Sequence, residues 1–422
     1  MSVDRVILGK DCIYSTDPRE TGVNNNVLVC GSSGCGKTMS VSEPLLLETN
    51  NSSLITMVTK RRIVSKYKPM FERRGYDVLD LNFVNPSQGN IGYDPMKYVG
   101  SYQDITFLAE SIVKSDPRKD NSHADPYWDS AATSLLSAEI AYILMTKDNA
   151  SFSDVLSFHD SIQFEESCGE IETNIDREFE RIAEKDPTCF AVSCWKTFRQ
   201  LPIRTASCVF SSLNTVIDTI FTQDIRNMMA SSRLVDFEKL ASKKTILFIT
   251  TSPVNHALHC FVNMFYGHVF KQLFEFAESR PDGMLPLPVH VLCDDFATGS
   301  RILNFAEYIS IFREKRISVT LLLQSESQLE AMYGAEDATT IINNCDSYLY
   351  MGGMDIKTAQ HISLRLDTTL DEVLYMPIGR EILFRRGQRP IITERYNITA
   401  NEQYQAETRH YEEKLKAAVS ER

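Results

Sequence analysis

Apolar, β-branched runs alternate along the chain with stretches whose apolar positions have helical spacing. Seven runs have the length and composition of buried strands, at residues 26–30, 53–58, 76–81, 245–250, 289–293, 318–323 and 347–351. Helical patterns lie between most of them, as in residues 39–47. Strands that alternate with helices predict an α/β fold with a mostly parallel, doubly wound sheet, in which ligands bind at the carboxyl ends of the strands.

The strand pattern is lost between about residues 104 and 204, and helical spacing replaces it, as in residues 128–144. We therefore expect an all-alpha domain at residues 105–204, inserted into an α/β domain made of residues 1–104 and 205–400. The remaining residues, 401–422, are charged and rich in helix formers, which predicts a surface helix or a frayed end.

The composition is that of a folded protein. Of the 422 residues, 43% are hydrophobic and 24% are charged. The net charge of −12 argues against a protein that coats nucleic acid through overall basicity, although a basic groove or ring pore remains compatible with it. The ten cysteines are scattered without a C-x-x-C pair, which is typical of reduced thiols in a cytosol.

Signals for membrane insertion are not evident in the sequence. No run reaches the roughly eighteen apolar residues that span a bilayer, and the first residues lack the apolar core of a signal peptide. We expect a cytoplasmic chain.

One eight-residue stretch fits the phosphate-binding pattern G-x-x-x-x-G-K-S/T at every constrained position. It consists of Gly31, Ser32, Ser33, Gly34, Cys35, Gly36, Lys37 and Thr38. A predicted strand precedes it and a predicted helix follows it, so a chance glycine-serine turn is the weaker interpretation. In such a loop backbone N–H groups face the phosphates, Lys37 neutralises the β and γ oxygens, and Thr38 offers its hydroxyl to Mg²⁺. The stretch predicts binding of ATP with Mg²⁺.

A second candidate element is the strand at residues 289–293, which ends in two acids. Asp294 is expected to hold Mg²⁺, and Asp295 to orient or deprotonate the attacking water. P-loop motors usually have glutamate at the second position, so the shorter Asp295 is compatible with slow or partner-dependent hydrolysis. Without the phosphate-binding loop, the acids would be read as a solvated strand end.

Gln324 ends the next predicted strand, where ATPases of this layout place a sensor of the γ-phosphate or of the attacking water. Arg313 belongs to a cationic segment shortly before that strand. From spacing alone, Arg313 is either part of a charged helix end or an arginine finger that reaches the nucleotide of a neighbouring subunit.

These residues together resemble the type IV secretion coupling proteins, the TraG/TraD-like conjugation ATPases. The resemblance spans nearly the whole chain and rests on the order and spacing of short motifs: Asn24-Asn25-Asn26 before the loop, Tyr93-Asp94-Pro95-Met96, Asp125-Pro126-Tyr127-Trp128, Asp294-Asp295-Phe296, Gln324 to Leu329 with Tyr333-Gly334, and Asn343 to Asp346 before Gly352-Gly353.

The resemblance implies a RecA-like P-loop ATPase with an inserted all-alpha domain, which forms a homo-hexameric ring and moves DNA. It also implies delivery of relaxase-bound DNA to a type IV secretion channel, with a relaxase or relaxosome protein and a membrane component as partners. Arg313 matches the position of the family's arginine finger. The acids of the insert favour protein recognition there rather than DNA binding.

Three features depart from the family pattern. The acid-Pro-Lys-Gly-acid run after the second strand is replaced by residues 58–62, in which only Lys60 matches. Asp295 stands where the family has glutamate. The family's N-terminal membrane anchor is missing, so we expect an anchorless form that lies at the inner face of the membrane through a partner protein, with a truncated chain as the alternative.

Two other functions remain open. The chain could be a nucleotide-gated docking adaptor with little hydrolysis, or a DNA motor of the FtsK/HerA type, against which the helical insertion argues. A cationic stretch either contacts DNA phosphates or an acidic partner, or forms a solvated helix face; it contains Lys60, Arg61, Arg62, Lys66, Lys68, Arg73 and Arg74.

Overall fold

The computed structural model describes residues 4–58, 60–114, 126–167, 170–252, 255–297 and 301–420. In this part of the chain, nine strands form one sheet in the order β13-β12-β11-β3-β10-β9-β4-β8-β5. Their bounds are β3 Val27–Cys30, β4 Ser53–Val58, β5 Asp77–Asn82, β8 Thr245–Thr250, β9 Val289–Cys293, β10 Ile317–Leu323, β11 Ser347–Tyr350, β12 Arg380–Arg385 and β13 Ile391–Glu394.

The seven strands from β11 to β5 run parallel, and β12 and β13 extend the sheet antiparallel at one edge. All seven strands predicted from the sequence are present, within one or two residues of the expected bounds. The α/β fold class with a mostly parallel sheet is confirmed.

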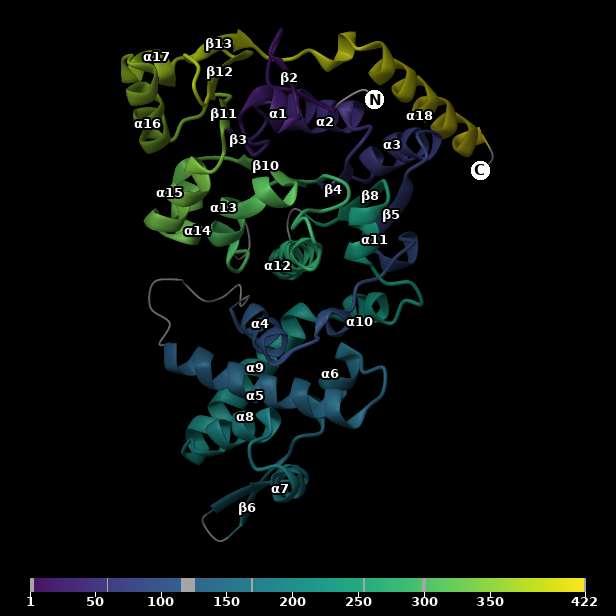
Figure 1. Ribbon diagram of the computed structural model, residues 1–422, viewed down its shortest axis with the longest axis vertical. Helices are drawn as coiled ribbons and strands as arrows, with labels where there is room; N and C mark the ends of the chain where they lie inside the picture. The colour runs from purple at the N-terminus through teal and green to yellow at the C-terminus, as the bar shows by residue number, and fades with distance from the viewer. Residues whose placement is uncertain are drawn as a thin grey trace.

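Helices cover both faces of the sheet, because alternate side chains of each strand point to opposite sides (Figure 1). On β10, Leu322 packs into one hydrophobic cluster while Leu321 and Leu323 pack into the other. The first cluster includes residues of α2 (Glu43–Glu48) and α3 (Arg61–Arg73). The second includes residues of α12 (His256–Glu278) and α13 (Phe305–Lys315).

Shorter elements complete this α/β part. They are β1 (Arg5–Ile7), β2 (Ile13–Ser15), α1 (Pro18–Thr21), α11 (Phe237–Ser242), α14 (Glu326–Tyr333), α15 (Ala335–Asn343), α16 (Ile356–Leu366) and α17 (Leu370–Leu374), with short turns of helix at η2 (Pro86–Gln88), η3 (Pro95–Tyr98) and η4 (Ile398–Ala400). None of the helices in the described ranges combines the length and the apolarity that crossing a membrane requires.

The charged C-terminal tail forms α18 (Glu402–Ser420), which lies along α3 (Figure 1). Arg73 of α3 pairs with Glu407 at 2.5 Å, and the ammonium of Lys66 lies 3.4 Å from the ring centroid of Tyr404. The tail is therefore an ordered helix that packs on the α/β part.

The insertion is mainly helical and extends away from the sheet (Figure 1). Its helices are α4 (Tyr102–Val113), α5 (Pro126–Thr146), α6 (Phe152–Asp160), α7 (Asp176–Lys185), α8 (Phe190–Arg199), α9 (Ile203–Ile220) and α10 (Gln223–Met229). The prediction of a wholly helical insert is wrong, because β6 (Phe164–Ser167) and β7 (Glu170–Thr173) pair as an antiparallel hairpin. The predicted bounds, residues 105 and 204, fall inside α4 and α9, and the helices continue to the end of α10. These strands are four residues each and rich in glutamate, so they lack the apolar alternation that identifies a strand.

Helix α12 joins the insertion to the sheet through one continuous hydrophobic cluster. The ring of Phe261 on α12 lies 5.3 Å from that of Phe83, which follows β5, and 5.7 Å from that of Phe221, which follows α9. Movement of the insertion relative to the sheet would therefore disturb a shared core.

A buried histidine of α12 should make the folded protein sensitive to mild acid. His268 contacts the Tyr93 hydroxyl, and burial lowers its pKa to about 3. Below pH 6.5 the unfolded chain takes up a proton at this residue that the folded chain does not, so stability falls as pH falls through this range. Between pH 7.5 and pH 5.5 we expect His268 to lower the free energy of unfolding by about 1 kcal/mol.

Urea unfolding at the two pH values tests this expectation. His268→Gln should lose less stability between pH 7.5 and 5.5 than the parent, whereas His410→Gln, on the half-exposed side of α18, should behave like the parent. An equal loss in the parent and in His268→Gln would contradict it.

Candidate functional site

The sheet order brings the predicted site residues to one side of the sheet, the edge formed by the carboxyl ends of its parallel strands. Strands β3, β10 and β9 are parallel neighbours, with Leu323 opposite Cys30 and Leu321 opposite Cys293. The phosphate-binding loop, Gln324 and the two acids follow the carboxyl ends of these three strands. Because these ends share one edge, the structure brings the loop, the sensor candidate and the acids together.

The phosphate-binding loop is held by its neighbours along the sheet. The Gly31 N–H donates to the Leu323 carbonyl at 3.2 Å, and the Ser32 N–H donates to the Gly352 carbonyl at 3.0 Å. A Cβ at Gly31 would lie 2.8 Å from the Cys35 sulfur, so a side chain does not fit there. Gly34 and Gly36 have φ of 76° and 94°, a region that glycine adopts without strain.

Lys37 rests on the loop itself. Its Nζ donates to the carbonyls of Gly31 at 2.5 Å and Ser32 at 3.2 Å. The loop therefore holds the ammonium group on two carbonyl oxygens, and phosphate oxygens could take the place of these carbonyls.

The helix after the loop begins with a π-helical turn, η1 (Thr38–Ser42), in which the Glu43 N–H donates to the Thr38 carbonyl. Pro44 gives the physical reason, because its ring has no N–H and would clash with the Ser40 carbonyl in a regular α-helix. The half-exposed Thr38 is thereby fixed at the start of this helix, directly after Lys37.

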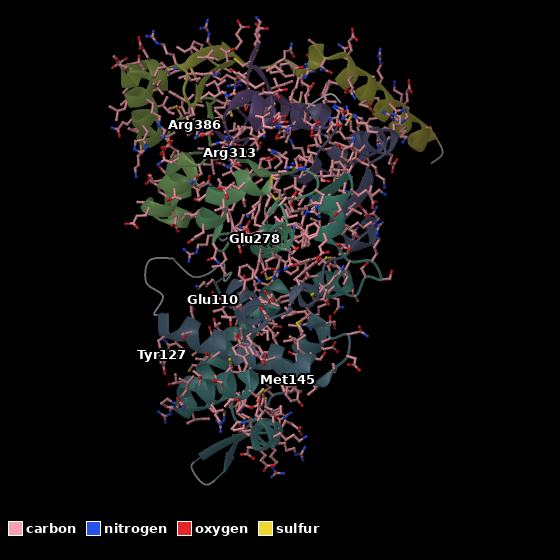
Figure 2. All side chains as sticks on the ribbon, viewed as in Figure 1. Glu110, Tyr127, Met145, Glu278, Arg313 and Arg386 are labelled. Carbon is pink, nitrogen blue, oxygen red and sulfur yellow. The ribbon has the colours of Figure 1, made fainter. Side chains whose placement is uncertain are left out.

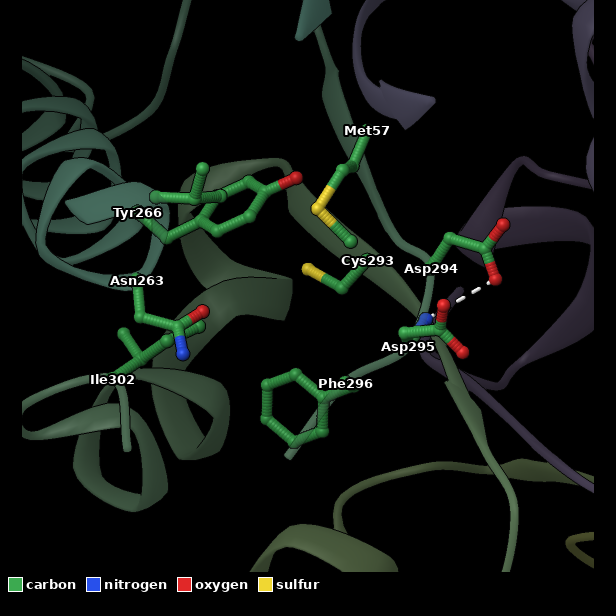
Figure 3. Close-up of a pocket in the computed structure, with 9 residues that line it drawn as sticks. Met57, Asn263, Tyr266, Cys293, Asp294, Asp295, Phe296 and Ile302 are labelled. Atoms are coloured by element: carbon green, nitrogen blue, oxygen red, sulfur yellow. Dashed lines mark hydrogen bonds between the residues drawn. The ribbon is translucent and has the colours of Figure 1, made fainter. Parts of the chain in front are cut away.

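Asp294 is directed toward the same side of the sheet as the helix that follows the loop. Leu292 packs in the cluster that contains α2, Cys293 packs in the opposite cluster, and Asp294 continues this alternation. Figure 3 shows the carboxylate turned away from the small cavity into which Cys293, Met57 and Tyr266 project. Burial and the neighbouring charge of Asp295 raise the pKa of Asp294 to about 6, while Lys37 and Lys60 act in the opposite direction.

Asp295 lies in a strained turn. Its φ is 52° and that of Ala297 is 63°, a left-handed conformation that is uncommon for residues other than glycine. The Asp295 N–H donates to the Asp294 carboxylate at 3.1 Å (Figure 3), and the Phe296 N–H donates to the Leu322 carbonyl at 3.0 Å. The backbone therefore turns sharply after Asp294 and is fixed to β10, next to Gln324.

Lys60 is exposed and acts electrostatically on Asp294 from the end of β4. β4 pairs with β9, so this cation lies at the same edge as the acids. Thr59, directly before Lys60, and Asp125 of the motif at the start of the insertion lie outside the described residues.

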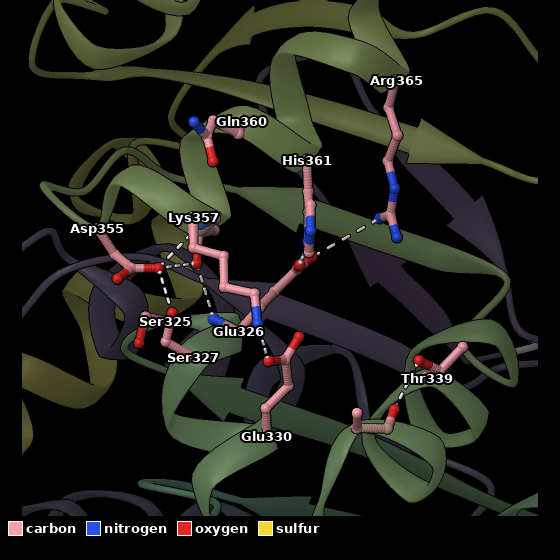
Figure 4. A network of polar contacts seen from close by, with 12 residues as sticks. Ser325, Glu326, Ser327, Glu330, Thr339, Asp355, Lys357, Gln360, His361 and Arg365 are labelled. Atoms are coloured by element: carbon pink, nitrogen blue, oxygen red, sulfur yellow. Dashed lines mark hydrogen bonds and ion pairs between the residues drawn. The ribbon is translucent and has the colours of Figure 1, made fainter.

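Gln324 is exposed at the end of β10. The next helix, α14, is bonded to the segment between β11 and α16, in which the Gly352 carbonyl accepts the Ser32 N–H (Figure 4). The Glu326 N–H donates to the Thr358 hydroxyl at 2.9 Å, and the Ser327 hydroxyl donates to the Asp355 carboxylate at 2.8 Å. His361 of α16 bonds the buried Glu326 carboxylate at 2.5 Å. A displacement of Gln324 would therefore be transmitted to α16.

Arg313 does not join the other candidates within one chain. It lies at the end of α13, just before β10 begins, and its side chain is exposed (Figure 2). Seven strand residues, about 20 Å, separate that end of β10 from Gln324. Arg313 therefore cannot contact a nucleotide at the loop of its own chain, and both the charged helix end and an action on another subunit remain compatible with its position.

Four of the seven cations in the cationic stretch make internal contacts, so for these four neither interpretation holds. Arg61 forms a bidentate ion pair with Asp80, with N···O distances of 2.6 and 2.8 Å, and Lys66 pairs with the buried Glu43 at 3.2 Å. Arg73 pairs with Glu407, as described above. The acidic partners lie elsewhere in this chain, which the local sequence pattern could not reveal.

Arg74 caps the helix that follows the phosphate-binding loop. Its guanidinium donates to the carbonyls of Thr49 at 2.6 Å and Leu47 at 2.8 Å, at the end of α2. We expect Arg74→Ala to lower the free energy of unfolding by about 2 kcal/mol, because two charge-assisted hydrogen bonds to a helix end are lost.

The matched control is Arg62→Ala, on the exposed side of α3, which should change stability by less than about 0.5 kcal/mol. Urea unfolding measures both. Equal stability of the two variants would contradict the capping role, and a loss of DNA affinity in Arg74→Ala without a loss of stability would favour phosphate binding.

The chain matches the profile of one protein family over most of its length. The profile of the type IV secretory system conjugative DNA transfer family matches residues 2–370. The chain belongs to this family. It is similar to a conjugal transfer protein TraG from Rhizobium radiobacter, with 22% identity over 361 residues, which cover 83% of this chain and 53% of that protein. The chain thus spans about half the length of this curated relative.

Solved structures of the plasmid coupling protein TrwB have a similar fold. With the non-hydrolysable ATP analogue ADPNP, TrwB superposes with a TM-score of 0.64 at 18% identity, covering 88% of this chain and 85% of that chain. With ADP and Mg²⁺ the TM-score is 0.61 at 18% identity, over 88% and 86%. VirB4 of Thermoanaerobacter pseudethanolicus superposes with a TM-score of 0.59 at 13% identity, over 96% and 100%. The resemblance stated from the sequence is confirmed for family and fold.

The sequence did not identify the residues after β11 that contact the phosphate-binding loop. Gly352 accepts the Ser32 N–H, and a Cβ on Gly31 would lie 2.9 Å from Met351 Cβ. The pair Gly352-Gly353 entered only as part of the family resemblance. Its position after a predicted buried strand was the available signal, because parallel neighbours end at the same edge.

Proposed function

We propose that the chain is an ATP-hydrolysing motor that moves DNA in conjugation. The observation that carries the proposal is the shared edge at which the phosphate-binding loop, Gln324 and the two acids meet. Membership of the conjugative DNA transfer family supports DNA as the substrate. The solved complexes of TrwB with ADPNP and with ADP and Mg²⁺ support the choice of ligands.

The residues present fit a nucleotide with Mg²⁺. Backbone N–H groups of residues 33, 34 and 36–38 and the Lys37 ammonium would bind the phosphates, while the Thr38 hydroxyl and the Asp294 carboxylate would hold the ion. Bound Mg²⁺ would neutralise charge on the phosphate oxygens during transfer. Asp295 would orient and deprotonate the attacking water, and Gln324 would contact the γ-phosphate or that water.

The proposed assembly is a homo-hexameric ring in which Arg313 of one subunit serves the nucleotide of the next. Its exposure, and its distance from the phosphate-binding loop of its own chain, support this role. The cargo would be DNA with an attached relaxase or relaxosome protein, and a membrane component of the secretion system would hold the ring at the inner face of the membrane. The inserted helices are the candidate surface for protein cargo.

A docking adaptor is the second candidate function. It is favoured by Asp295, whose side chain is one methylene shorter than the glutamate expected at this position. In that case ATP binding would control assembly, and another protein would drive transport.

Steady-state ATP hydrolysis with and without single- or double-stranded DNA separates the two functions. For a motor, turnover rises with DNA in the parent and is lost in Asp295→Asn, and Asp295→Glu retains or increases turnover because its carboxylate reaches further. Tight ATP binding with negligible turnover under every DNA condition would contradict the motor and support the adaptor.

A further inference from the structure

Arg395, far from the phosphate-binding loop in sequence, lies beside it in space. It follows β13, and its backbone N–H donates to the Gly379 carbonyl at 2.9 Å. Its Nη1 is 3.7 Å from the position that a Cβ on Gly36 would take. The guanidinium is thus next to the turn that leads into Lys37.

The guanidinium has unused hydrogen-bond capacity at this position. Its Nη2 donates to the Met351 carbonyl at 3.2 Å, and its Nε is buried without a hydrogen-bond partner among the described residues. Arginine has five N–H donors in a planar fork that matches phosphate oxygens. A cation with free donors beside a phosphate-binding loop is suited to a further phosphate contact.

A buried acid on the next strand acts electrostatically on this cation without bonding to it. Glu381 of β12 is fully buried, and in the described part of the chain neither carboxylate oxygen has a hydrogen-bond partner. Burial raises the pKa of Glu381 to about 7, and the charge of Arg395 opposes this increase. The β1–β2 turn closes over the acid, since a Cβ on Gly9 would lie 2.7 Å from its Oε1.

We propose that Arg395 is a second phosphate-binding cation of the nucleotide site, supplied by the same chain. The inference rests on the proposed function, because it assigns a further contact to the same nucleotide. Arg395 would leave the Met351 carbonyl for a phosphate oxygen next to Gly36, as Lys37 would leave the carbonyls of Gly31 and Ser32. Unlike Arg313, it would act without a neighbouring subunit and on ADP as well as ATP.

Direct nucleotide binding in dilute protein tests the inference. Competition of ATP, ADP and AMP against a fluorescent ADP analogue gives the three affinities in the parent, Arg395→Gln and Arg395→Lys. The matched control is Arg389→Gln, an exposed arginine of the β12–β13 connection. Circular dichroism and urea midpoints show whether each variant is folded.

Arg395→Gln should weaken ATP and ADP about tenfold and AMP less, since a charge-assisted phosphate contact is lost. Arg395→Lys should retain part of the affinity because the charge remains, and Arg389→Gln should match the parent. Two results would overturn the inference without affecting the proposed function. Folded Arg395→Gln could bind ADP as tightly as the parent, or it could lose affinity for ATP, ADP and AMP by the same factor. A parent that binds neither ATP nor ADP would overturn the proposed function as well.

Discussion

Lys37→Ala is expected to lower ATP turnover by at least about a hundredfold. The Nζ of Lys37 contacts two loop carbonyls, and its charge lowers the pKa of Asp294. Loss of the cation removes charge neutralisation where negative charge accumulates during phosphoryl transfer. Steady-state phosphate release with saturating DNA measures the effect.

The control for Lys37→Ala is Lys243→Ala. Lys243 is exposed just before β8, at the edge of the sheet opposite the loop, and its substitution changes the net charge by the same amount. Turnover of this variant should equal that of the parent. If Lys37→Ala kept more than about a tenth of parental turnover, phosphoryl transfer at this loop would be contradicted.

Arg313→Ala is expected to lower turnover about a hundredfold or more while leaving ADP affinity unchanged. The separation of binding from turnover follows from its location, because Arg313 lies at the amino end of β10 and cannot reach the nucleotide of its own chain. Glu314→Gln, at the adjacent exposed position, is the control and should retain turnover.

Mixing variants distinguishes action between subunits from a structural role. Arg313→Ala subunits have an intact Lys37, and Lys37→Ala subunits have an intact Arg313, so some interfaces in a mixed ring contain both residues. With random assembly of equal amounts, about a quarter of the interfaces do, and turnover should return to that order. No recovery on mixing, with subunit exchange confirmed, would contradict the role of Arg313 across the interface.

The sequence was sufficient to predict the strands of the parallel part of the sheet. Buried parallel strands are continuous apolar runs, and all seven were predicted, as were the positions of the loop, Asp294 and Gln324 at their carboxyl ends. The common location of the loop, Asp294 and Gln324 could also be predicted, because neighbouring parallel strands have their carboxyl ends on the same side of the sheet.

The edge strands and the charged contacts could not be predicted in this way. Strands β12 and β13 pair antiparallel at the edge of the sheet, and β13 alternates half-buried and exposed residues, so a continuous apolar run is absent. The pairing of Arg73 with Glu407 and the approach of Arg395 to Gly36 join residues more than three hundred positions apart. Such contacts depend on the tertiary arrangement and leave no local pattern.

Release of streptavidin from biotinylated DNA is the most direct test of an ATP-driven DNA motor. With ATP, the parent should displace streptavidin from the end of single- or double-stranded DNA, and the displacement should be absent with a non-hydrolysable analogue and in Lys37→Ala. DNA-stimulated ATP turnover by the parent without displacement, or displacement that persists in Lys37→Ala, would contradict the account.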